Sequence, residues 1–272
     1  MYIAPTCLRR SGYGHNGRTV ADLALKGLRK DSAVARQLID LSMAVHNKMM
    51  TFPRVVPPSL TMQESWEEFA ERVGAAKHGV NWLTAHYRIE IGDHIGTHMD
   101  SLRHMRDDAC GPEGIPLEYC YGDAVCLDFR HLPKGAGITV ADAKKALCGI
   151  KYSLKPRDIV LIHTGAGKIQ DSEAYLTDHV GMTSEATEWF LDQGIVMMGI
   201  DAVTFDPPIW AMFERKQFWE SHRVMLKREY YHLENLTNLD QVPPSGFRVS
   251  VFPIKWVHTT AAPVRAVAII EN

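Results

Sequence analysis

The segment Gly92–His104, with the sequence GDHIGTHMDSLRH, concentrates three histidines and two aspartates in thirteen residues. An alternating apolar pattern precedes it and Gly96 interrupts it, so an extended chain with a turn is favoured over a helix. In an extended chain His98 and Asp100 project to the same side, and a turn at Gly96 can bring His94 beside them. Two imidazoles and one carboxylate suit Zn(II), Mn(II) or Fe(II). Single histidines are more often surface or hydrogen-bonded core residues, but this density predicts a metal site.

The elements that must position this segment are predicted from apolar periodicity. Helices are expected at residues 65–73, 139–147 and 183–194, and Thr139 with Asp142 forms a capping-box pattern. Strands are expected at residues 37–42, 86–92, 123–129, 158–165 and 195–201. Strands and helices are interspersed, which predicts an α/β fold.

No convincing boundary divides the main part of the chain. We therefore expect one α/β domain over residues 37–272, behind an N-terminal extension at residues 1–36 that is rich in arginine and lysine. The extension contains one plausible amphipathic helix near residues 19–30.

Composition excludes several functional classes. The chain has 272 residues and a formal net charge of −2, so no nucleic-acid partner is expected. Its five cysteines form no CxxC pair, which predicts reduced thiols, a cytoplasmic location and no zinc held by thiolates. We expect no signal peptide, because the N-terminus has no apolar stretch of that kind, and no membrane partner, because no apolar run is long enough to cross a bilayer.

The motif HIGTHMD followed by His104 resembles the HxGTHxDxPxH signature of the cyclase-like metal hydrolases, a family that includes kynurenine formamidase and isatin hydrolase. Segments IDLS, IVLIHTG, HLENLTNLD and APVRAVAI resemble further family segments, so the resemblance covers nearly all of the chain from Gln37 onward. It implies a compact α/β domain with a swivelling β/β/α core, in a homodimer or homotetramer. The chain departs from the pattern at Leu102, where the family has Pro, and at His163, where it has Arg.

The resemblance also implies a set of metal ligands. His94, His98 and Asp100 would hold a first ion, and Asp100 would bridge to a second ion held by His222 and Glu234. Relatives with a single Mn(II) carry an amide in place of the distal carboxylate, so a glutamate favours two ions. We expect two Zn(II) ions, with Mn(II) as the alternative.

The expected reaction is hydrolysis of a small-molecule amide, formamide, lactam or lactone by metal-activated water, with His104 as the general acid/base. The resemblance and the FDPPIW loop suggest four substrate-binding residues: His163, Asp201, Phe205 and Trp210. His232 is a weak additional candidate, because it stands two residues before Glu234 and can share its side of a strand.

Two other functions stay open at this level. Some relatives close rings in polyketide-type pathways, so a metal-dependent cyclase/dehydratase is the first alternative. A non-enzymatic metal-binding protein is the second, but structural zinc sites are normally closed and often rich in cysteine. A further histidine beside the expected ligands favours an open, working site.

Overall fold

The computed structural model of the protein describes residues 36–271. The expected N-terminal extension and its helix near residues 19–30 lie outside the described residues, apart from Arg36. None of the helices within residues 36–271 is long and apolar enough to cross a membrane. The cytoplasmic location expected from the cysteines stays a prediction.

A mixed nine-stranded sheet organises the domain, in the order β1-β13-β11-β5-β7-β9-β10-β4-β12. Its centre, β5-β7-β9-β10, is parallel, and the strands on both sides pair antiparallel. In chain order these strands are β1 (Arg36–Asp40), β4 (His98–Asp100), β5 (Tyr121–Asp128), β7 (Ile159–His163), β9 (Met197–Ile200), β10 (Tyr231–Glu234), β11 (Phe247–Ser250), β12 (Ala261–Pro263) and β13 (Val267–Glu271).

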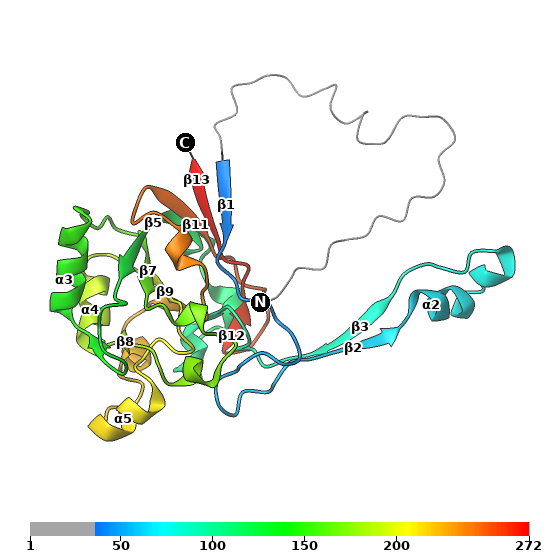
Figure 1. The fold of residues 1–272 in the computed structure, drawn as a ribbon, viewed down its shortest axis with the longest axis horizontal. Helices are drawn as coiled ribbons and strands as arrows, with labels where there is room; N and C mark the ends of the chain where they lie inside the picture. Colours follow the sequence, from blue (N-terminus) through cyan, green and yellow to red (C-terminus); the bar gives the residue numbers. More distant parts are fainter. Residues whose placement is uncertain (1–35, 272) are drawn as a thin grey trace, which may run out of the picture. The chain divides into compact units, whose positions relative to one another are not determined.

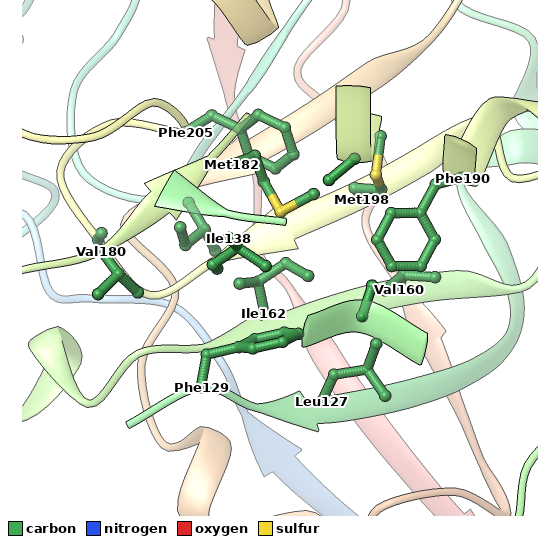
Figure 2. Packing of buried hydrophobic residues seen from close by; sticks show 14 of the residues in the cluster. Leu127, Phe129, Ile138, Val160, Ile162, Val180, Met182, Phe190, Met198 and Phe205 are labelled. Carbon is green, nitrogen blue, oxygen red and sulfur yellow. The ribbon is translucent and has the colours of Figure 1, made fainter. Parts of the chain in front are cut away.

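Buried residues form two apolar clusters, as expected for a sheet whose central parallel strands are covered on both faces. The larger cluster includes residues of α3 and α4, which lie next to each other against the sheet in Figure 1. Figure 2 shows its packing around Ile162, Met198 and Phe205. The described helices are α2 (Trp66–Arg72), α3 (Val140–Gly149), α4 (Ser184–Asp192), α5 (Ile209–Arg215) and α6 (Glu220–Arg223).

Local sequence signals predicted most of these elements. The capping box of Thr139 and Asp142 is present at the start of α3, with hydrogen bonds in both directions. The expected buried strands β7 and β9 are buried along their whole length, including His163 at the end of β7. Each of these two strands is shorter than expected by three residues because its ends pass into loops.

Residues 86–92 form a strand as expected, but not in the main sheet. β3 (His86–Glu90) pairs only with β2 (Ser59–Glu64), and all five residues of β3 are exposed. Its alternating apolar residues Tyr87 and Ile89 lie opposite Met62 and Leu60 of β2. The alternation therefore describes one apolar face of a two-stranded hairpin. A second two-stranded sheet, of β6 (Gly137–Ile138) and β8 (Gly181–Met182), is parallel.

Gly181 in β8 has no room for a side chain. A Cβ atom there would lie 2.0 Å from the carbonyl carbon of Asp206, and backbone cannot move aside cheaply. We expect Gly181→Ala to lower the free energy of unfolding by about 1–3 kcal/mol, as overpacking does. Urea denaturation measures this change. Gly149→Ala at the end of α3 is the control, because no atom lies within 4 Å of its added methyl group. Equal stability of the two variants would contradict the prediction.

Candidate metal centre

The centre is built on two antiparallel strands that place polar side chains opposite one another. In the register of β4 with β10, His98 pairs with Glu234 and Asp100 pairs with His232. Because side chains alternate along a strand, all four project to the same face of the sheet. Met99 lies between the two donors of β4, and Leu233 lies between the two donors of β10. Both side chains are fully buried in the apolar cluster on the other face of the sheet.

A first donor group surrounds one oxygen of Asp100. His94 Nδ1 lies 3.0 Å and His98 Nε2 lies 3.3 Å from Asp100 Oδ1. The two histidine nitrogens are 3.2 Å apart. His94 reaches this position because Gly96 has a left-handed backbone with φ of 57°, which turns the chain just before β4. The turn predicted at Gly96 is thus confirmed.

A second donor group surrounds the other oxygen of Asp100. His232 Nε2 lies 3.2 Å and His222 Nε2 lies 3.5 Å from Asp100 Oδ2. Glu234 Oε1 completes the group at 3.4 Å from His222 Nε2 and 3.6 Å from His232 Nε2. His222 comes from α6, whereas His232 and Glu234 come from β10. Asp100 is therefore placed to bridge the two groups.

Outer hydrogen bonds orient three of the histidines. His98 Nδ1 lies 2.9 Å from the Gly96 carbonyl oxygen, to which it donates. His222 Nδ1 lies 2.5 Å from Asp206 Oδ2, and His94 Nε2 lies 2.8 Å from Thr260 Oγ1. In each case the other ring nitrogen faces Asp100, which is the arrangement that metal-binding histidines use to fix their tautomer.

A hydrogen bond from the backbone orients Glu234 as well. Its Oε1 accepts a hydrogen bond of 2.7 Å from the backbone N–H of Phe205. This contact leaves Oε2 facing the first donor group, 3.5 Å from His98 Nε2. Glu234 therefore presents one oxygen to each group, as Asp100 does.

The two buried carboxylates of this centre, Asp100 and Glu234, need positive charge beside them. Burial raises the pKa values of Asp100 and Glu234, but the surrounding histidines hold both well below their usual range. Burial also lowers the pKa of His98, yet the two carboxylates raise it to about 10. The two buried carboxylates thus draw positive charge toward themselves, and bound metal ions would provide it.

Both oxygens of Asp100 are fully buried and have no hydrogen-bond partner among the described residues. Buried carboxylate oxygens normally have partners, so these two need a ligand. Donors bound to a tetrahedral zinc ion at about 2.0–2.1 Å lie about 3.3 Å from one another. The separations of 3.0–3.6 Å within the two groups match that spacing. The cluster of histidine and carboxylate side chains fits metal ions.

A cavity of about 460 Å³ opens directly against these donors. His94, His98, His222 and Glu234 line it, and so does His104. Its other walls are mostly apolar: Phe52, Val55, Met105, Val203, Phe218 and Trp219. Mostly apolar walls with a few converging polar groups are typical of a small-molecule site.

His104 stands beside the donors at the cavity wall. Its Nε2 lies 3.7 Å from Asp100 Oδ2, farther than the donors of either group. Its ring centroid is 4.4 Å from that of His94 and 5.5 Å from that of His222. Burial lowers the pKa of His104 to about 4, although Asp100 opposes this shift. A neutral imidazole at this place can accept a proton and pass it on.

The four residues expected to bind substrate do not line the cavity. Asp201 is buried and accepts hydrogen bonds from the backbone N–H groups of Thr164 and Gly165, so it joins the ends of β7 and β9. His163 lies beside it, with 4.0 Å between His163 Nε2 and Asp201 Oδ2. Their role in substrate binding stays a prediction without support from this geometry.

Phe205 and Trp210 occupy different positions again. Phe205 is fully buried and its ring stacks on His232, with centroids 4.4 Å apart and an interplanar angle of 12°. Phe205 therefore packs against a histidine of the centre and does not line the cavity. Trp210 is 44% exposed and donates to the carbonyl of Thr177, away from the donors. A contact of either ring with substrate also stays a prediction.

Sequence reasoning gave little weight to two residues of the centre. Asp206, which orients His222, follows from no local pattern because α5 and the loops on both sides of it separate the two residues along the chain. The sequence contains a pattern that indicates His232 as a donor. HLE at residues 232–234 has the same spacing as HMD at residues 98–100, and both patterns place two donors on one face of a strand.

Two bacterial kynurenine formamidases are similar to this chain in sequence. The chain is 29% identical over 179 residues to kynurenine formamidase of Bordetella petrii, covering 66% of this chain and 78% of that protein. It is 28% identical over 233 residues to kynurenine formamidase of Paracidovorax citrulli, covering 85% and 96% of the two chains.

Solved structures share the fold. An isatin hydrolase bound to the product analogue thioisatinate aligns with a TM-score of 0.74 and 18% identity, covering 87% of this chain and 93% of that one. Isatin hydrolase A from Ralstonia solanacearum aligns with a TM-score of 0.74 and 20% identity, covering 95% and 100%. These likenesses confirm the expected α/β fold class. The sequence profile described as "Putative cyclase" matches residues 39–207, and the chain belongs to this cyclase family.

Proposed function

We propose that this protein is a metal-dependent hydrolase that cleaves the C–N bond of a small aryl formamide or cyclic amide. The observation that carries the proposal is Asp100, whose two buried oxygens each face a group of histidine and carboxylate donors beside a cavity. The names of the relatives, kynurenine formamidase and isatin hydrolase, support an amide bond as the target. The ligands are His94, His98, Asp100, His222 and Glu234.

The metals are proposed to be two Zn(II) ions, with Mn(II) as the alternative, because imidazole and carboxylate donors suit both. Such ions lower the pKa of water to about 7 and polarise a substrate carbonyl. His104 moves the proton between water and the leaving amine, because it lines the cavity next to Asp100. The apolar walls hold the aryl ring and exclude bulk water. A structural clamp would need no cavity of about 460 Å³ against its donors.

Two alanine variants separate the proton carrier from the ligands. We expect His104→Ala to keep most of its bound metal and to lose roughly 10²–10⁴-fold in kcat, the usual contribution of a positioned acid/base. His98→Ala should lose metal and turnover together, because His98 Nε2 belongs to the first donor group. Elemental analysis and steady-state kinetics on an N-formyl arylamine measure both.

The wild-type protein treated with a chelator and reloaded with Zn(II) or Mn(II) is the control, and its activity should disappear and return. Loss of metal from His104→Ala to the extent seen in His98→Ala would show that His104 is a ligand. Full turnover of the metal-free protein would contradict the proposed function as a whole.

The cavity also indicates what the substrate carries besides its amide. Arg223 at the end of α6 contributes the one lysine or arginine among the residues that line it. Its guanidinium forms no ion pair with any side chain of residues 36–271. We propose that Arg223 binds an anionic group, such as a carboxylate, on an aromatic substrate whose ring contacts the apolar walls.

We expect Arg223→Gln to raise the KM for an N-formyl arylamine with a ring carboxylate by about 10-fold, at the low end of the range for hydrogen bonds to charged groups because Arg223 is exposed. The KM for the same compound without the carboxylate should not change. Steady-state kinetics with the two compounds test this. Equal changes for both would contradict a role in anion binding.

We also propose that the protein is a homo-oligomer whose hairpin of β2 and β3 contacts a second copy. Met62, Tyr87 and Ile89 are 40–61% exposed on one face of this hairpin. A two-stranded hairpin is marginally stable alone and gains stability when such a face is covered. The expectation of a homodimer or homotetramer from the family resemblance points to a second copy as the covering partner.

Ile89→Asp should shift the protein toward the monomer, because a charge at the centre of an apolar interface is costly. Light scattering coupled to size-exclusion chromatography measures the molar mass in solution. Arg88→Ala is the matched control, because its side chain projects to the opposite face of β3 and is 73% exposed. A wild-type protein that is monomeric at micromolar concentration would contradict the proposed assembly.

A further inference from the structure

We infer that His232 is a sixth metal ligand, which gives the second donor group four protein donors, all of them buried. This inference rests on the proposed function, because it concerns ions at the same centre. Neither the pattern HxGTHxDxPxH nor the pairing of His222 with Glu234 requires a histidine at position 232.

The position of His232 Nε2 is that of a donor. It lies 3.2 Å from Asp100 Oδ2 and 3.6 Å from Glu234 Oε1. These separations match those of His222 Nε2 from the same two oxygens, 3.5 and 3.4 Å. The two histidines thus stand equivalently toward the pair of carboxylates. Donors about 3.3 Å apart are what a tetrahedral zinc ion requires.

The two ring nitrogens of His232 form no hydrogen bond within the described residues. The side chain is completely buried, and neither Nδ1 nor Nε2 has a hydrogen-bond partner there. A buried imidazole without partners is costly, since its polar atoms lose water and gain nothing. Ligation of an ion by Nε2 removes that cost at the nitrogen that faces Asp100.

Aromatic neighbours hold the ring in this orientation. Phe205 stacks against His232 with an interplanar angle of 12°, and the Tyr230 ring lies 5.6 Å from it at 32°. The His222 ring meets it edge-on at 4.6 Å. A ring held on three sides loses little further freedom when it binds an ion, which favours ligation.

The two donor groups then differ in the burial of their histidines. Asp100, His222, His232 and Glu234 supply four donors, the number that closes a tetrahedral shell. The first group has His94, His98 and one oxygen each of Asp100 and Glu234, and its His94 is only partly buried. His232 does not line the cavity, whereas His94 does. His232 would therefore act as a buried ligand, out of contact with a substrate in the cavity.

The first experiment counts histidine ligands directly in the wild-type protein. The protein is labelled with ¹⁵N-histidine and loaded with ¹¹³Cd, and the histidine nitrogens that couple to cadmium are counted by NMR. We expect four coupled histidines, namely His94, His98, His222 and His232. Two bound ions with only three coupled histidines would overturn the role of His232 alone. Absence of any bound ion would instead overturn the proposed function.

The second experiment distinguishes a ligand from a residue that merely positions Asp100. In His232→Gln, zinc titration should show one site weakened by more than about 100-fold, beyond the 10–100-fold cost typical of outer-shell changes. The other site should keep its affinity. Asp206→Asn provides the outer-shell benchmark, because Asp206 contacts His222 and no donor oxygen.

His179→Leu controls for the loss of a buried imidazole. His179 is also buried with an unpartnered Nε2, but it is not part of the donor group. It should change zinc affinity by less than 10-fold. A loss in His232→Gln no greater than in Asp206→Asn, or an equal loss at both sites, would overturn the inference. Circular dichroism verifies that each variant is folded before titration.

Discussion

The buried carboxylate of Asp100 is the constraint on which the rest of the centre depends. A carboxylate that is removed from water without hydrogen bonds is strongly disfavoured unless positive charge surrounds it. Here four histidines approach its two oxygens, and they come from the loop before β4, from β4 itself, from α6 and from β10. The electrostatic demand of one side chain therefore explains why these distant segments meet.

The pairing of β4 with β10 fixes the positions of the donors around Asp100. In the antiparallel register of β4 and β10, two donors of one strand face two donors of the other across the sheet. In a sheet the Cβ atoms of such cross-strand neighbours lie about 4.5–5.5 Å apart, so the donor atoms can converge without long, flexible side chains. Fully apolar residues between the donors anchor both strands in the core, which keeps the register from slipping.

The environment divides the centre into a supporting side and a working side. Behind His232, Phe205 and Tyr230 pack tightly and belong to the same apolar cluster as the centre of the sheet. In front of His94 and His104, a cavity with apolar walls and one arginine is open. This asymmetry is what a hydrolytic site needs, because rigid ligands preorganise the chemistry while substrate enters from one direction.

The sequence alone determined the α/β class, the alternation of elements and the His94, His98 and Asp100 cluster, since local periodicity and spacing encode all three. The resemblance to a family added His222 and Glu234, which the structure brings to the same carboxylate. Only the tertiary structure decided that His232 faces Asp100, that Asp206 orients His222, and that His163 and Asp201 lie away from the cavity lining. Strand register joins His232 to Asp100, and the loops around α5 bring Asp206 to His222. No local pattern carries that information.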